Sequence, residues 1–99
     1  MEIVAAAMAG TLESSDAQVT VEPADGLEIR LSSSVMSQYG RQIRQVVADT
    51  LARLEVTGAK VTVIDKGALD CTLKARVEAA ALRGAGRQGD AVPWGGAVR

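Results

Sequence analysis

Histidine is absent from this 99-residue chain, and cysteine occurs once, at Cys71. Histidine is the usual general base near neutral pH and the commonest metal ligand, so its absence argues against self-contained hydrolytic or metal chemistry. A single cysteine cannot form a disulfide within the chain, and no Cys/His cluster has the spacing of a zinc site. We therefore expect no catalytic residue and no metal ligand in this protein.

Aromatic residues are almost as scarce, since phenylalanine is absent and only Tyr39 and Trp94 remain. The core must consist of Val, Leu, Ile, Ala and Met, and nucleobases would find few rings to stack on. Neither sign of charge dominates, because 11 basic residues stand against 12 acidic ones for a net charge of −1. Proteins that bind nucleic acid normally carry a basic excess, so nucleic acid is not expected as a partner.

Long hydrophobic runs are missing as well. The apolar stretch at residues 1–10 is far shorter than the roughly 20 residues that a membrane-spanning helix needs. Its early charge is Glu2, where a secretory signal would carry Lys or Arg. These features predict a cytoplasmic protein with no membrane partner.

What the chain does contain is alternation of apolar and polar residues, the pattern of half-buried β-strands. Residues 17–22 and 27–31 alternate in this way on either side of segment 23–26, whose Pro, Asp and Gly are typical of a turn. We expect these two strands to form a β-hairpin. Residues 60–65 predict a further strand, and residues 3–8 offer an optional N-terminal one.

A first amphipathic helix is predicted after the serines at 32–34, whose hydroxyl groups can cap it. Its apolar stripe comprises Met36, Tyr39, Ile43, Val46, Val47, Leu51 and Leu54. Gly40 is a weak point near its start. Arg41 and Arg44 lie on the other face, either simply in solvent or as docking points for an acidic partner.

A second helix is expected to begin near Asp70 or Thr72, either of which could cap it. Its apolar stripe comprises Leu69, Leu73, Val77, Ala80, Ala81 and Leu82. Its solvent-facing residues are Lys74, Arg76, Glu78 and Arg83. Lys74 and Glu78 have the i,i+4 spacing of a charge pair on a helix surface.

Together these elements predict an α+β fold, with a small, mostly antiparallel sheet made of the β-hairpin and a further strand. Two helices would pack on one face of this sheet, in the order ββαβα. Residues 1–83 are expected to form a single domain. Residues 84–99 are rich in Gly and predict a mobile C-terminal tail, in which Trp94 is a possible anchor. The tail contains G-x-G-x-x-G at 84–89, but this motif follows a helix and opens none, so it predicts no dinucleotide site.

The candidate functional residues lie in a polar segment at 10–16, with the sequence GTLESSD. Ser14 and Ser15 are either ordinary loop or N-cap serines or exposed hydroxyl groups that a modifying enzyme can reach. A second polar cluster, DKGALD at 65–70, either forms only a turn and a cap or helps to orient a partner. Cys71 is interpreted as a buried or half-buried small apolar residue rather than a reactive thiol, because no histidine could activate it.

Two of these segments, AGTLESSD at 9–16 and DKGALDCTLKAR at 65–76, resemble the signature of the citrate lyase acyl carrier protein, the gamma subunit. QYGRQIR at 38–44 and the Pro-Trp pair at 93–94 are similar too, so the resemblance covers essentially the whole chain. The serine of the Leu-Glu-Ser motif carries a prosthetic group in that family, and by position this is Ser14. Common acyl carrier proteins instead carry Asp-Ser-Leu at the start of a helix in an all-α bundle, and this chain has neither feature.

The resemblance implies that a prosthetic-group transferase attaches 2'-(5''-phosphoribosyl)-3'-dephospho-CoA to Ser14 through a phosphodiester, and that Ser15 is not the acceptor. The thiol of this group would hold acetyl and citryl thioesters while the alpha (transferase) and beta (lyase) subunits cleave citrate to acetate and oxaloacetate. The carrier would be a non-catalytic subunit that keeps the thioester tethered near successive active sites.

Two alternatives fit the same residues. The chain could be the carrier of a related complex, citramalate lyase or malonate decarboxylase. It could also be a non-catalytic interaction module, in which case neither serine would gain mass.

Overall fold

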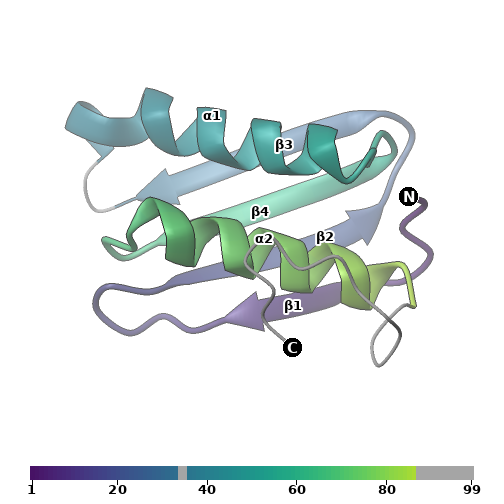
Figure 1. Ribbon diagram of the computed structural model, residues 1–99, viewed down its shortest axis with the longest axis horizontal. Coiled ribbons are helices and arrows are strands. Elements are labelled where there is room, and N and C mark those ends of the chain that lie inside the picture. The colour runs from purple at the N-terminus through teal and green to yellow at the C-terminus, as the bar shows by residue number, and fades with distance from the viewer. Residues whose placement is uncertain (34–35, 87–99) are drawn as a thin grey trace.

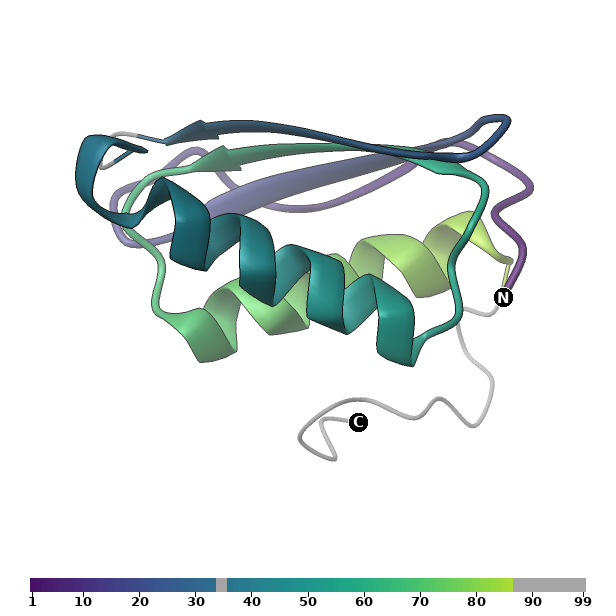
Figure 2. The ribbon, with the colours of Figure 1, turned by 90° about the horizontal axis from the view of Figure 1, so that it is seen from above.

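The computed structural model describes residues 1–33 and 36–86, and this part of the chain forms a four-stranded sheet and two helices. The elements are β1 (Ala7–Gly10), β2 (Ala17–Pro23), β3 (Leu27–Ser33), α1 (Met36–Arg53), β4 (Ala59–Asp65) and α2 (Asp70–Gly84). Figure 1 shows both helices lying in front of the sheet, roughly along the strands, and the view turned by 90° in Figure 2 shows that they cover the same face. The predicted α+β fold is therefore confirmed.

The sheet has the strand order β1-β2-β4-β3, with two antiparallel pairs and one parallel pair between β3 and β4. Its inner face follows the predicted alternation, because Ala17, Val19 and Val21 of β2 and Ala59, Val61 and Val63 of β4 are fully buried. Register places Val19 beside Val63 and Val63 beside Leu31, so one row of branched side chains crosses three strands. These rows and the helix stripes form one aliphatic core without Phe.

The predicted β-hairpin is wrong, although both of its strands and its turn exist. β4 lies between β2 and β3, and the turn bonds to the start of β4: Gly26 O accepts from Ala59 N at 3.0 Å. Alternation specifies which face of a strand is buried but not which strand is its neighbour. Ala59, Val61 and Val63 are fully buried, which a central strand achieves and an edge strand does not. The long helical crossover between β3 and β4 is also the connection that parallel neighbours require.

The optional N-terminal strand lies further along the chain than predicted, at Ala7–Gly10 rather than at residues 3–8. Residues 3–5 instead approach the end of α2. Ile3 is buried in the core, and the amides of Val4 and Ala5 donate to the carbonyl of Gly84 at 2.9 and 3.1 Å. Gly84 has no room for a side chain, since a Cβ there would lie 2.7 Å from Cγ2 of Val21.

The first predicted helix is confirmed as α1, which runs without interruption through Gly40. Ile43, Val47, Leu51 and, just after the helix, Leu54 are buried as the stripe predicts. The structure does not confirm the predicted serine caps. Ser32 and Ser33 belong to β3, and Ser34 lies outside the described residues.

The second helix begins at Asp70 as expected, but its N-cap is Leu69 and no side chain caps it, so neither Asp70 nor Thr72 has the predicted role. Leu69 is 71% exposed, whereas the rest of its stripe is buried. A residue at the N-cap precedes the first full turn, so the helical period does not decide which way it faces.

Two residues predicted to face solvent form ion pairs instead. Glu78 is buried on the inner side of α2, and its carboxylate accepts a hydrogen bond from Arg53 at the end of α1. Arg76 reaches the loop between β1 and β2. A charged residue on an apolar helix face is compatible with burial when a charged partner meets it there.

Both edges of the sheet carry an arginine from the helix above them. Arg44 on α1 donates to the carbonyl of Ile29 on β3 at 3.1 Å, and Arg83 on α2 donates to the carbonyl of Met8 on β1 at 2.8 Å. Arg44 is therefore not merely solvated, as one sequence interpretation had it. The two contacts occupy carbonyl groups that edge strands otherwise leave open.

α2 extends one residue past the predicted domain limit at residue 83, because Gly84 is its last residue. The predicted tail falls mostly on residues 87–99, including Trp94, which lie outside the described residues. The division into a domain and a tail stays a prediction. Neither helix in the described part of the chain has both the length and the apolar character to cross a membrane.

Candidate functional site

The loop at residues 11–16 joins β1 to β2 at one end of the molecule, on the left of Figure 1. The loop between β4 and α2 lies at the same end, as does the start of each helix. The two segments that carried the family resemblance are therefore neighbours in space, although about fifty residues separate them in the sequence.

Three backbone hydrogen bonds give the loop one shape. Ser15 N donates to Lys66 O at 2.8 Å, and Lys66 N donates in return to Asp16 O at 2.9 Å. Asp16 N also donates to Glu13 O at 3.2 Å, which closes a four-residue turn with Ser14 and Ser15 at its centre. The loop between β4 and α2 thus serves as the support for the serine turn.

Asp16 anchors this turn through its side chain. Its two carboxylate oxygens accept from Arg76 Nε at 2.9 Å and Arg76 Nη2 at 3.1 Å, from Thr11 Oγ1 at 2.7 Å and from Ala17 N at 2.7 Å. These bonds, those from Arg76 above all, hold the pKa of the Asp16 carboxyl far below its usual range. Asp16 is therefore charged at any pH at which the protein would work.

Gly10 is required where it stands, at the end of β1. Its φ is +90°, and a Cβ there would lie 1.8 Å from the carbonyl oxygen of Ala17 and 3.0 Å from Cδ of Arg76. Gly10 therefore has a steric role, because only a residue without a side chain allows the end of β1 to lie this close to Ala17 and Arg76.

Ser14 and Ser15 differ although they are adjacent. Both are exposed, but Ser15 has a left-handed φ of 67° and its amide is bonded to Lys66. Ser14 precedes it at the corner of the turn, and no hydrogen bond ties its hydroxyl group to any residue in the part of the chain that the structure describes. Ser14 is thus accessible from solvent.

The cluster at 65–70 is mainly structural. The side chain of Asp65 is buried at the end of β4, where one oxygen accepts from Ala68 N at 3.0 Å and the other from Ser33 Oγ at 2.8 Å. Asp70 accepts from Gln42 Nε2 at 3.0 Å and so ties the first turn of α2 to α1. The predicted turn is present, and the alternative role in orienting a partner stays a prediction.

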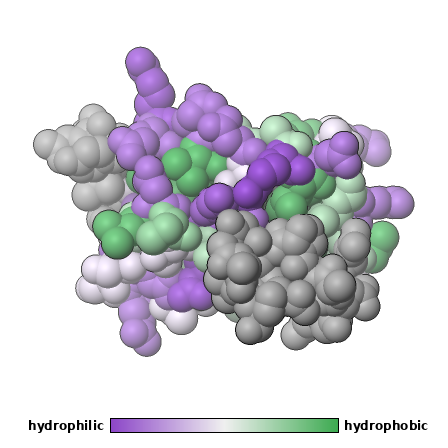
Figure 3. Space-filling view, viewed as in Figure 1, coloured by the Kyte–Doolittle hydropathy of each residue, from purple (hydrophilic) through white to green (hydrophobic). Residues whose placement is uncertain are grey.

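Apolar surface is visible at this end of the molecule in the space-filling view, where α2 begins (Figure 3). A hollow of about 420 Å³ lies there and includes Ile43, Ala68 and Leu69 in its lining. Leu12, in the serine loop, is a second exposed apolar residue. Cys71 is exposed too, so its interpretation as a buried or half-buried residue is wrong.

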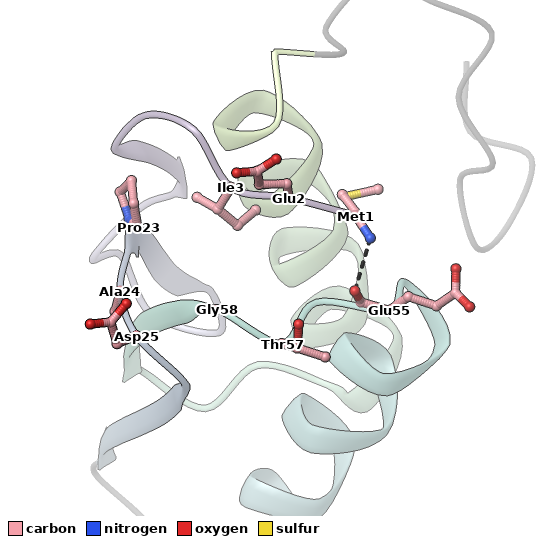
Figure 4. Close-up of a pocket in the computed structure, with 9 residues that line it drawn as sticks. All are labelled: Met1, Glu2, Ile3, Pro23, Ala24, Asp25, Glu55, Thr57 and Gly58. Atoms are coloured by element: carbon pink, nitrogen blue, oxygen red, sulfur yellow. Dashed lines mark hydrogen bonds between the residues drawn. The ribbon is translucent and has the colours of Figure 1, made fainter.

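A second hollow, of about 660 Å³, lies at the opposite end of the molecule (Figure 4). Met1, Glu55 and the turn after β2 line it, and the Met1 amine donates to Glu55 O at 2.8 Å. None of its lining residues belongs to either resemblance segment. We assign it no role.

Ser14 offers an exposed hydroxyl group. No cluster of three or more His, Cys, Asp or Glu side chains suited to a metal ion exists among residues 1–33 and 36–86. A phosphodiester on Ser14 needs an accessible hydroxyl group, room for a large substituent and a backbone that keeps its shape. The exposed corner of a turn bonded to two other segments fits all three needs.

Comparison with known proteins assigns the chain to a family of carriers. The model of a family named ACP and described as "Malonate decarboxylase delta subunit (MdcD)" matches residues 4–84. The citrate lyase acyl carrier protein of Haemophilus influenzae (strain PittGG) is 58% identical over 83 residues, which cover 84% of this chain and 87% of that protein.

Two further relatives agree. The citrate lyase acyl carrier protein of Streptococcus uberis is 56% identical over 87 residues, covering 87% of this chain and 86% of that protein. The citrate lyase acyl carrier protein of Oenococcus oeni is 50% identical over 95 residues, which cover 95% of this chain and 97% of that protein. The chain belongs to the citrate lyase acyl carrier protein family, as the two sequence segments indicated.

Sequence reasoning singled out Ser14 but missed what holds it. Arg76 was expected in solvent, and Asp16 was included only as part of the polar segment at 10–16. Their pairing spans 60 positions, and nothing in either local pattern points to the other. The signal was the presence of both residues in the two segments that carried the family resemblance.

Proposed function

We propose that this protein is the acyl carrier subunit of a citrate lyase and that Ser14 bears its covalent prosthetic group, 2'-(5''-phosphoribosyl)-3'-dephospho-CoA. The observation that carries the proposal is that Ser14 lies exposed at the corner of a fixed turn, with no hydrogen-bond partner for its hydroxyl group among residues 1–33 and 36–86. The relatives named citrate lyase acyl carrier protein, up to 58% identical, support the same assignment. When bound, the group supplies a thiol that holds the acyl group as a thioester.

The chain's own residues present and support this attachment point. Lys66 and Asp16 hold the backbone on the far side of Ser15, so that Ser14 projects from a stable base. A tethered group reaches several active sites at a high effective concentration without diffusing away. The protein therefore has no need of a catalytic residue of its own, and a chain without histidine suits this non-catalytic role.

The partners that follow from this role are the alpha (transferase) and beta (lyase) subunits of the lyase and the transferase that attaches the group to Ser14. Neither a nucleic acid nor a membrane is needed. We propose that the assembled complex lies in the cytoplasm.

Intact-mass spectrometry after co-expression with the attachment enzymes tests the proposal. The unchanged protein should gain the mass of the group, and Ser14→Ala should gain none while keeping its fold. Ser15→Ala is the matched control and should be loaded. Loading of Ser14→Ala together with loss of loading in Ser15→Ala would move the site by one residue, and no added mass in any variant would favour the interaction module.

A malonate decarboxylase carrier is the second candidate, because the matching family model carries that description. Turnover by the assembled complex separates the two, with citramalate as a third substrate. We expect cleavage of citrate and neither cleavage of citramalate nor decarboxylation of malonate.

A further inference from the structure

We propose that Arg76 is a positioning residue for the modification of Ser14, acting through Asp16 to keep the 11–16 loop in the conformation that the attachment enzyme recognises. This inference rests on the proposed function. It adds a residue on α2, far from Ser14 in the sequence, to the determinants of the attachment reaction.

The first step is that Arg76 and Asp16 form a directed clamp. Two nitrogens of the guanidinium group meet the two carboxylate oxygens at 2.9 and 3.1 Å, the paired geometry that fixes orientation as well as distance. Thr11 and the amide of Ala17 donate to the same carboxylate, so it is bonded from three parts of the chain. The Asp16 side chain is 13% exposed, which shields the clamp from water.

The second step is that the turn needs such a clamp. Ser15 has a φ of 67°, a left-handed conformation that a residue with a side chain adopts only when its surroundings impose it. The surroundings here are the bonds of the Ser15 amide to Lys66 and of the Asp16 carbonyl to the Lys66 amide. Both bonds require the backbone of Asp16 to stay where Arg76 holds its side chain.

The third step concerns recognition. Without the clamp the loop would populate several conformations, and the attachment enzyme would find Ser14 correctly placed in only a fraction of molecules. The apparent affinity of a protein that is only partly competent falls by that fraction. The loss therefore falls on KM and leaves kcat unchanged, because a bound, correctly placed serine reacts as before.

The clamp is distinct from the support of the core. The Arg76 side chain is 38% exposed, and the residues of α2 that fill the core are Leu73, Val77 and the alanines at 80 and 81. Removing the guanidinium group opens no cavity among them. Loosening of the loop can therefore be observed in a protein whose helices and sheet stay folded.

The test measures prosthetic-group transfer to the full-length chain by its attachment enzyme, with intact mass as the readout. Arg76→Ala and Asp16→Asn should each raise KM by about three- to tenfold, with kcat within about twofold of the unchanged protein. Arg76→Lys keeps the charge but loses the paired geometry, so its KM should lie between that of the unchanged protein and that of Arg76→Ala. Arg83→Ala is the matched control, because it removes an arginine of the same helix that bonds to β1 instead of to the loop.

Hydrogen exchange supplies a second readout that does not depend on any enzyme. In Arg76→Ala the amides of Ser15 and Lys66 should exchange faster, while those in β4 stay protected. In Arg83→Ala they should exchange as in the unchanged protein. Asp16→Asn keeps the shape of the side chain and carries the test if Arg76→Ala does not fold.

The outcomes separate this inference from the proposed function. If Ser14→Ala still gains the group, Ser14 is not the acceptor and the proposed function fails at this residue. If Ser14→Ala gains none but Arg76→Ala and Asp16→Asn load with an unchanged KM, the proposed function stands and the positioning role is overturned. An equal rise in KM in Arg83→Ala would also overturn it, because the effect would then follow the loss of any arginine on α2.

Discussion

Asp16 shows how one side chain can define a functional loop. It receives hydrogen bonds from Thr11 in the loop, from the backbone at the start of β2 and from Arg76 on α2. The sequence pointed to this stretch and to Ser14 within it, because local residue types mark polar turns and a family motif marks the acceptor. It could not reveal the partner of Asp16, since ion pairs between distant segments have no local pattern.

The ionisation of Asp16 predicts a pH dependence of stability. Folding lowers the pKa of this carboxyl group, mainly through Arg76, so the charged form stabilises the folded state above the unfolded pKa of about 4. That contribution is lost as the pH falls from there through the folded value. Thermal unfolding should therefore show Asp16→Asn less stable than the unchanged protein at neutral pH, with the gap closing in acid. A gap that stays constant down to about pH 2.5 would contradict the assignment.

At the scale of elements, the sequence predicted which face of each strand is buried better than it predicted which strands are neighbours. Val19, Val21, Val61 and Val63 alternate as predicted and are all fully buried. The same alternation cannot say that β4 enters between β2 and β3, because a hairpin would bury the same faces. Glu78 was wrongly predicted to face solvent for a related reason, because only the packing of α1 against α2 brings Arg53 to it.

The contribution of the Arg53–Glu78 ion pair to stability can be measured by substitution. The Glu78 side chain is 3% exposed and that of Arg53 is 45% exposed, so removing the arginine leaves a buried carboxylate without its partner. We expect Arg53→Ala to lower the free energy of unfolding by about 2–4 kcal/mol in urea denaturation. Replacing both residues by leucine should be milder, because no buried charge remains. A double variant that is less stable than the single one would show that the pair is worth more than its burial costs.

The molecule as a whole depends on one small core in which aliphatic packing replaces aromatic bulk. Composition predicted this core, and one domain of this size follows from the chain length. The placement of residues 3–5 against the end of α2 was not foreseen, because Gly84 looks like the start of a tail until its close contacts with Val21 and Ala5 are known.

The shared core predicts a cooperative response to a single cavity. Leu51 on α1 is fully buried, so Leu51→Ala should lower the free energy of unfolding by about 3 kcal/mol. Leu27 is 45% exposed at the start of β3, and Leu27→Ala should change the free energy of unfolding by less than about 1 kcal/mol. Far-ultraviolet circular dichroism and amide exchange should report one common transition for helices and sheet. Separate transitions would show two independent units.

The arginines at the two sheet edges have a consequence for how this protein can be built into an assembly. Arg44 and Arg83 each cover a backbone carbonyl on an outer strand, at Ile29 and at Met8. A neighbouring subunit that sought to continue the sheet would first have to displace a charged side chain at either edge. We therefore expect these two arginines to disfavour joining of neighbouring copies into a common sheet.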